Sequence, residues 1–470
     1  MPGEMTTRKV NSRPGDAGSA SSAGARYRRL PTGAHGLTRE QVEQDQRERL
    51  RSAMIELIAQ RGYPAVRILD LTQLAHVSRP TFYNLFADKE ELLLSSYEDI
   101  AGRTTRRVAE AYAEGDSPEH SVQLALRAFA ELAAAEPEAM TLALLGTFGA
   151  GPRALQRRAG TLNALEAIVE AGRAAPPARR SRDLTAKFVI GGIREVSASR
   201  LRSGRAEELV ERGRELAAWA ACYPAALPLG LEGPPRVRAR RSAEKPSLQP
   251  RARRPEGRLP SGRHDLTRED VVRSQRERIV YATAAIVAEK GFAGLTIPEI
   301  ASRANVSHET FYEMYETKHD AFLGAQKVGL HQALRVTAEA FDGVEVAWPE
   351  RVAAGLNALL RFVHSEPEHA HLTLVDTFGA SPRAIEIRDG ALAAFGEFLR
   401  PGYELAPAGV EVPGVANEAV AGGVWQVMHQ YIEQQRLHEL CDAAPQLVYL
   451  TLTPFIGAER AAEVARRSTS

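Results

Sequence analysis

The chain has 470 residues, of which 44% are hydrophobic, and a formal net charge of +1. This length is enough for two or three domains with ordinary cores. Its two cysteines, Cys222 and Cys441, exclude a disulfide framework and indicate a reducing compartment. The longest apolar run, 217–231, is broken by two prolines and is too short to span a bilayer. We therefore expect a cytoplasmic protein without a membrane partner.

Basic residues are concentrated in two stretches rich in proline, glycine and serine. Residues 1–30 carry six bases and two acids, and residues 234–263 carry ten bases and two acids. Because the whole chain is nearly neutral, the remainder is net acidic. Basic arms on an acidic body are typical of proteins that meet nucleic acid. The alternative is that these arms are only solvated linkers.

The sequence contains a long internal repeat. VSRPTFYNLFADKEELL (77–93) returns as VSHETFYEMYETKHDAF (306–322), and TFGAGPRA (147–154) returns as TFGASPRA (377–384). A repeat of about 200 residues is a duplicated domain, not a solenoid. We call the copies unit one (31–227) and unit two (261–460). The first predicted divisions are a basic arm (1–30), a first helix-turn-helix domain (31–95) and a first regulatory domain (96–227). A linker (228–260), a second helix-turn-helix domain (261–324) and a second regulatory domain (325–460) follow.

Each unit opens with a predicted long helix. Apolar residues recur at helical spacing in LRSAMIELIAQRGY (50–63) and in IVYATAAIVAEKGF (279–292). Thr38 and Thr267 are placed to cap these helices, and Gly62 and Gly291 to end them. Helical spacing continues through both units and no useful strand pattern occurs, so the predicted fold class is all-α.

Two short helices joined by a tight turn follow the first helix. In unit two, Thr296 with Glu299 predicts a capping box for the second helix. Asn305 stands where a turn can require the left-handed conformation, and Ser307 is placed to cap a third helix. This order predicts a helix-turn-helix motif.

The third helix keeps its apolar residues between the copies and changes the others. Its predicted anchors are Phe82, Leu85 and Phe86 in unit one, and Phe311, Met314 and Tyr315 in unit two. The residues between the anchors differ in charge, as in RPTFYN against HETFYE. A reading face that changed its target explains this pattern, and so does ordinary surface drift of a duplicated helix.

The pattern VS..TFY...F..K.EL, with the preceding helices, resembles the recognition helix of TetR/AcrR-type transcriptional regulators. The resemblance covers roughly 40–93 and 269–323 well and the later helices more weakly. It implies operator DNA as partner, pairing through the last helices of the fold, and a small-molecule effector that releases DNA. The DNA-facing residues that it implies are Arg67, Ser78, Arg79, Pro80, Thr81, Tyr83, Asn84, Lys89, Thr296, Ser307, His308, Thr310, Tyr312 and Lys318.

The sequence departs from the family pattern at several of these positions. The turn glycine is replaced by His76 in unit one and by Asn305 in unit two. Arg67 stands where unit two has the capping threonine. Glu309 and Glu313 would face a polyanion, so we expect unit two to read DNA more weakly or to have a narrower target.

Candidate effector and metal sites are less specific. Apolar and aromatic residues that could border an effector pocket are Met140, Leu144, Phe148, Leu374, Phe378 and Trp425. The run HSEPEHAHL (364–372) gathers histidines and glutamates, which a metal site would need, but we interpret it as a solvated loop between helices and predict no metal and no cofactor.

The predicted function is a transcriptional regulator, a ligand-responsive repressor, and not an enzyme, because no catalytic motif such as GxSxG or HExxH occurs. The alternatives are a helical scaffold that binds small molecules without DNA, and an enzyme with an unrecognised active site. Helices 184–201 and 417–433 each contain a Gly-Gly pair, which predicts a close seam between the units and an intramolecular pseudo-dimer. The rival arrangement is a homodimer of two chains, which would carry four helix-turn-helix domains that read DNA. We call such a domain a reader.

Overall fold

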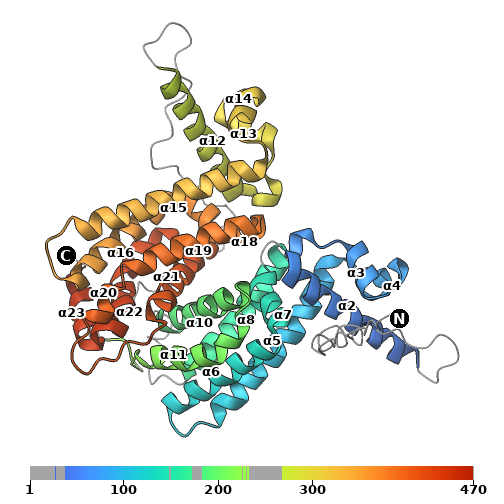
Figure 1. Ribbon diagram of the computed structural model, residues 1–470, viewed down its shortest axis with the longest axis horizontal. Coiled ribbons are helices and arrows are strands. Elements are labelled where there is room, and N and C mark those ends of the chain that lie inside the picture. Colours follow the sequence, from blue (N-terminus) through green and yellow to red (C-terminus); the bar gives the residue numbers. More distant parts are fainter. Residues whose placement is uncertain are drawn as a thin grey trace, which may run out of the picture.

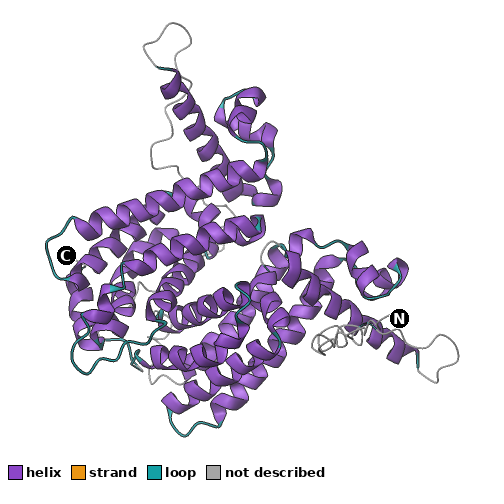
Figure 2. Cartoon of the chain, viewed as in Figure 1, coloured by secondary structure: helices purple, strands orange, loops and turns teal. Residues whose placement is uncertain are grey.

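The structure is a computed structural model of the chain. It describes residues 27, 38–147, 150–171, 183–224, 226–228, 230–231 and 267–468. Every regular element within these ranges is a helix (Figure 2), as the sequence predicted. The two predicted basic arms lie outside the described residues, except for Tyr27 and a few positions near 228. No described helix is both long and apolar enough to cross a membrane.

Unit one begins with three helices that form a small domain, and a long fourth helix joins this domain to the helical body (Figure 1). The predicted division at residue 95 falls inside this fourth helix, α5. The helices of unit one are α2 (Arg39–Arg61), α3 (Ile68–Leu74), α4 (Arg79–Leu85), α5 (Lys89–Ala113), α6 (Pro118–Ala135), α7 (Pro137–Thr141), α8 (Pro152–Ala171), α10 (Thr185–Arg202) and α11 (Leu209–Ala221).

Unit two repeats this order, and α12 to α14 project from the body at the top of Figure 1, apart from α2 to α4. Its helices are α12 (Arg268–Lys290), α13 (Ile297–Ala304), α14 (His308–Met314), α15 (Lys318–Asp342), α16 (Trp348–Ser365), α17 (Pro367–His371), α18 (Thr377–Ala380), α19 (Pro382–Glu397), α20 (Pro401–Glu404), α21 (Ala416–Glu433), α22 (Ala444–Ile456) and α23 (Ala458–Arg467).

The hydrophobic core joins the two units. One cluster of buried side chains centres on α10, α11, α16, α21 and α22, and so contains residues of both copies. Two smaller clusters lie under α2 to α5 and under α12 to α15. Each of these smaller clusters fixes one three-helix domain on its body.

Helices α10 and α21 lie against each other at their Gly-Gly pairs. A Cβ atom at Gly191 would come within 2.4 Å of the Gln426 Cβ, and one at Gly422 within 2.3 Å of the Glu195 Cβ. Real Cβ atoms do not approach other atoms so closely, so only glycine permits this separation of the helix backbones. We call this contact the seam.

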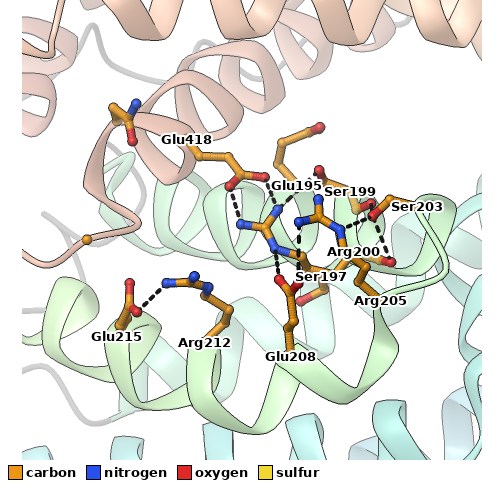
Figure 3. A network of polar contacts seen from close by, with 12 residues as sticks. Glu195, Ser197, Ser199, Arg200, Ser203, Arg205, Glu208, Arg212, Glu215 and Glu418 are labelled. Carbon is orange, nitrogen blue, oxygen red and sulfur yellow. Dashed lines mark hydrogen bonds and ion pairs between the residues drawn. The ribbon is translucent and has the colours of Figure 1, made fainter.

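Ion pairs cross the seam beside the glycines. Arg200 donates two hydrogen bonds to the Glu418 carboxylate, at 3.0 and 2.9 Å, and also contacts Glu208 (Figure 3). Arg388 of unit two donates to Glu195 at 2.8 Å, and Arg202 contacts Asp389 at 2.9 Å. Bidentate arginine–carboxylate pairs are directional, so they fix how the helices align.

The run 364–372 is not a solvated loop, and that interpretation was wrong. Residues 367–371 form α17, in which Glu368 and His369 are buried. The His369 ring lies 6.1 Å from the ring of Tyr281 on α12, and burial lowers the pKa of His369 to about 4. The residues of α17 therefore belong to the packing between α12 and the body. Within the described ranges, no group of three His, Cys, Asp or Glu residues is placed to hold a metal ion.

Candidate nucleic-acid interface

The first helix of each unit is capped as the sequence predicted. Thr38 accepts a hydrogen bond from the Gln41 backbone, and Thr267 accepts one from Asp270, each within a reciprocal capping box. Gly62 and Gly291 end these helices at φ values of 74° and 70°. The long helices α2 and α12 therefore start and stop where local residue chemistry requires it.

The turn between the two short helices uses the left-handed conformation in both units. His76 and Asn305 both have a φ of 52°. In unit one, Arg49 of α2 supports the turn, because its guanidinium donates to the carbonyls of Ala75 and His76 at 2.7 and 3.3 Å. In unit two, Arg278 donates to Ala304 and Asn305, at 3.0 Å each. An arginine bridge of this kind sets the angle between the short helices without glycine at the turn.

Helix α4 presents one apolar and one polar face. Phe82 is completely buried, and Leu85 and Phe86 are 7% and 3% exposed. Ser78 caps the helix by accepting from the Thr81 backbone at 3.1 Å. The predicted DNA-facing residues lie on the other side, where Arg79, Pro80, Tyr83 and Asn84 are exposed and Thr81 is partly exposed.

The polar face of α4 offers donors and a ring of the kinds that contact DNA. The Arg79 guanidinium lies 5.9 Å from the centre of the Tyr83 ring, which is 46% exposed. Arginine can bond a guanine edge with two donors, and tyrosine and asparagine can donate to phosphate oxygens. This face of α4 is therefore suited both to reading base edges and to positioning the helix on the DNA backbone.

Helix α14 repeats this geometry with a different charge. Phe311 is completely buried, whereas Met314 and Tyr315 are only partly buried, so the anchor is looser than in α4. Ser307 caps the helix by accepting from Thr310 at 3.0 Å. His308, Glu309, Tyr312 and Glu313 are exposed, which gives this reading face two carboxylates.

The starts of the second helices differ from the sequence prediction. Thr296 occupies the N-cap position of α13, but its side chain makes no capping hydrogen bond. Glu299 instead accepts from Lys290 at 2.6 Å, so the predicted capping box was wrong. In unit one, Asp70 accepts from the Arg67 backbone at 3.0 Å and also pairs with the Arg67 side chain. Arg67 would have to exchange this partner to reach a phosphate.

Lys89 and Lys318 each bind two backbone carbonyls of their own unit. The Lys89 ammonium donates to Tyr63 and Val66 at 3.1 and 2.8 Å and lies 4.0 Å from the centre of the Tyr63 ring. Lys318 donates to Leu295 at 3.0 Å. These contacts tie the fourth helix to the loop after the first. An ammonium has three donors, so one remains for the phosphate contact that we predict.

We expect Lys89→Ala to lower the free energy of unfolding by about 1–2 kcal/mol, because the Val66 carbonyl loses its charged donor. Chemical denaturation measures the change. Arg106→Ala removes an equal charge from the exposed face of α5 and serves as the control. Unchanged stability of the Lys89 variant would show that the carbonyl contacts contribute nothing.

Each body contains a cavity beside the seam, and the two cavities differ in size. The unit one cavity has a volume of about 590 Å³ and lies between α5, α6, α8 and α10. The unit two cavity has a volume of about 90 Å³. Met140 and Leu144 line the larger cavity, Leu374 and Trp425 line the smaller, and Phe378 lines a small pocket at the seam. Phe148 lies outside the described residues.

Two arginines on the wall of the unit one cavity were not predicted from the sequence. Arg158 is 3% exposed, and Arg194 donates across the seam to the Gln426 side-chain oxygen at 2.8 Å. Burial lowers the pKa of both arginines, to about 9 for Arg194. The available signal was an arginine directly after an apolar Gly-Gly-Ile run, where a solvated residue is not expected.

Comparison with known proteins identifies the three-helix domains. A family model described as bacterial regulatory proteins, tetR family, matches residues 50–95 and again residues 279–323. These segments contain most of α2 to α4 and of α12 to α14, together with the start of the helix that follows each. No curated protein matches the chain.

Several solved structures are similar to part of the chain. The fatty acid degradation regulator FadR from Bacillus halodurans is 15% identical, with 38% of this chain and 94% of that chain covered and a TM-score of 0.35. FadR from Bacillus subtilis, solved in complex with stearoyl-CoA, is 16% identical, with 37% and 96% covered and a TM-score of 0.34. The regulator PfmR from Thermus thermophilus is 20% identical, with 39% and 96% covered and a TM-score of 0.32.

The two family-model matches coincide with the two capped helix-turn-helix domains, whose third helices expose the predicted reading faces. The sequence repeat, the two sets of short helices and the two matched segments all indicate two such domains, at the same places in the chain. The chain is therefore a TetR-type transcriptional regulator that carries two tandem DNA-binding domains of this family.

Proposed function

We propose that the chain is a ligand-responsive repressor whose two units pair with each other as a pseudo-dimer and read an asymmetric operator. The observation that carries this proposal is the seam between α10 and α21. In a homodimer, two identical readers are held by a two-fold interface and face a palindrome. Here both readers belong to one chain, and their reading faces differ.

The contacts at the seam have the pattern of a two-fold axis. When the Gly-Gly pairs are aligned, residues 191 and 195 correspond to residues 422 and 426. Gly191 faces Gln426 and Gly422 faces Glu195, so each contact has its equivalent on the other side of the axis. This reciprocity is expected of an isologous interface that became intramolecular by duplication.

The charges at the seam favour unlike units. Arg200 of unit one pairs with Glu418 of unit two. The alignment places Lys187 of unit one at the position of Glu418. Pairing two copies of unit one would therefore bring Arg200 opposite a lysine, which costs free energy in a partly buried site. The pairing in the structure avoids this repulsion.

The cavity of unit one supports ligand response. It extends from the three-helix end of α5 to the seam, because Tyr97 and Arg194 both line it. A ligand there that fits one arrangement of α5 and α10 better than another would shift the equilibrium towards that arrangement, by as much as its affinities for the two differ. A different arrangement of these helices would change the distance between the two DNA-binding domains. The residues of the cavity wall thus connect an effector to both DNA-binding domains.

We expect Arg79→Ala to relax sequence preference in one half of the operator and to leave the other half unchanged, because only unit one carries this arginine. His308→Ala in unit two should change only the opposite half. Selection of bound fragments from a random pool by each variant measures both effects. An unchanged motif for Arg79→Ala would overturn the base-reading role of Arg79.

The rival arrangements give different results in solution. Light scattering of the complex distinguishes one chain on an asymmetric site from two chains on longer DNA. Two chains on one perfect palindrome would contradict the pseudo-dimer. A helical scaffold or an enzyme that does not use DNA would show no DNA binding even at low salt, where phosphate contacts are strongest.

A further inference from the structure

The unequal cavities have a cause in the sequence. With the units aligned, positions on the wall of the large cavity carry larger apolar side chains in unit two, and these side chains line the small cavity. The replacements from unit one to unit two are Ala101 to Leu330, Leu165 to Phe395, Ile168 to Phe398 and Arg194 to Trp425. The rings and the leucine fill the space that unit one leaves open.

One end of the large cavity carries its two arginines. Arg158, Arg194, Tyr97 and Thr161 all line it there, on the first part of α5, the first half of α8 and the middle of α10. Burial raises the pKa of Tyr97, and Thr161 is its hydrogen-bonding neighbour. Most of the remaining wall is apolar, with residues such as Phe129, Leu162 and Val169. One end of the cavity is thus suited to an acid and the body to an apolar chain.

The arginines at this end belong to a network of charges that continues into the seam. Arg158 and Arg194 lie in the same electrostatic cluster as the seam residues, where Glu195 and Asp389 contact Arg388 and Arg202. Glu433 is the further carboxylate that acts on Arg158. Both Arg158 and Arg194 also line the cavity, so an anion inside it can reach their guanidinium groups.

The cavity is long, and exposed residues line the end opposite the arginines. It extends along α5 from Tyr97 to Tyr112, which is about 22 Å at 1.5 Å per residue. At the far end it is lined by Ser117 and Glu119, both exposed at the surface. A ligand that enters there reaches the arginines with its leading end and leaves its trailing end near the mouth.

We propose that the cavity of unit one, and not that of unit two, binds one elongated apolar monocarboxylic acid per chain, with its carboxylate at Arg158 and Arg194. This assignment rests on the proposed ligand response and names the chemical class of the ligand. Arginine bonds carboxylates with two parallel donors, so the pair supplies both charge and direction. The volume of about 590 Å³ lies within the usual range for such ligands.

The same contact would carry the response to the seam. Arg194 donates to the Gln426 oxygen of unit two at 2.8 Å and to the Leu144 carbonyl at 3.4 Å. A carboxylate beside Arg194 competes with the neutral amide oxygen of Gln426 for these donors and forms the stronger bond. Binding would thus weaken one polar contact between the units.

Calorimetric titration of the full chain with dodecanoate, dodecan-1-ol and dodecanoyl-coenzyme A tests the assignment. We expect one site per chain, with dodecanoate bound about tenfold or more tighter than the alcohol. Arg158→Gln should remove this preference and leave alcohol binding unchanged. Equal affinity for acid and alcohol, two sites per chain, no binding of dodecanoate, or tightest binding of the thioester would each overturn it.

A second variant covers the case in which Arg158→Gln does not fold. Leu165→Phe with Ile168→Phe copies the residues of unit two into unit one and should abolish binding of dodecanoate. Phe395→Leu in unit two is the matched control and should leave it unchanged. Retained binding in the double variant would place the ligand elsewhere and overturn the assignment.

Fluorescence anisotropy of operator DNA separates this assignment from the proposed function. If dodecanoate releases DNA from the parent chain but not from Arg158→Gln, both the ligand class and the ligand-responsive repressor are supported. Binding of dodecanoate without release of DNA would leave the ligand class standing and refute the ligand-responsive repressor. Release of DNA by the alcohol alone would refute the ligand class and leave the ligand response standing.

Discussion

Gly422→Ala is expected to lower the free energy of unfolding by about 1–3 kcal/mol and to weaken DNA binding at the same time. The new Cβ would lie 2.3 Å from the Glu195 Cβ and 3.3 Å from the Gly191 carbonyl oxygen. The helix backbones must then move apart, and overpacking of this kind costs a few kcal/mol. Denaturant unfolding measures the stability, and anisotropy of labelled operator DNA measures the affinity.

A second glycine separates the effect of the seam from the effect of the residue type. Gly160 lies within α8, and a Cβ there would meet no atom within 4 Å. Because alanine favours helices, Gly160→Ala should stabilise the chain by roughly 0.5–1 kcal/mol. If Gly422→Ala behaves like Gly160→Ala, the seam does not form in solution.

Glu195→Gln is expected to have the larger effect on stability, a loss of about 3–5 kcal/mol. Glu195 accepts hydrogen bonds from Arg388 and from Arg202, and Arg388 is only 2% exposed. Glutamine has the same shape without the charge, so Asp389 would be the one carboxylate left of the two that contact both guanidinium groups. Thermal and denaturant unfolding measure the loss. Glu207→Gln, at an exposed position, is the control and should be neutral.

The pH dependence of this loss follows from the Glu195 pKa. Burial raises this pKa, but Arg388 and Arg202 together hold it below its ordinary value. A carboxyl with a lowered pKa contributes stability above the unfolded value of about 4.3 and loses it as the pH falls through the folded value. The difference between the parent chain and Glu195→Gln should therefore shrink below about pH 4.3. A constant difference would mean that the Glu195 charge is not the cause.

The parts of the fold that sequence could predict depend on local chemistry. Thr38 and Thr267 cap their helices, Gly62 and Gly291 end them, and Asn305 adopts the left-handed turn, because each effect involves residues only a few positions apart. The Gly-Gly pairs also indicated the seam helices, since repeated glycine inside a helix is costly without a close neighbour.

The parts that sequence could not predict depend on tertiary neighbours. Glu299 does not complete a capping box with Thr296 because Lys290, nine residues before it, donates to its carboxylate. His369 is buried because α12 covers it, which no local pattern reveals. The cavity arginines were missed for the same reason, because the size of a cavity depends on side chains from four helices together.

The seam also sets how the regulator depends on its own abundance. The two subunits of a homodimer dissociate when their concentration falls below the dissociation constant. At low copy number, each subunit then has only its own DNA-binding domain. Arg200 and Glu418 meet within one polypeptide, and their encounter is unimolecular. For the proposed pseudo-dimer, the occupancy of an operator would therefore rise in direct proportion to the number of molecules and not with its square.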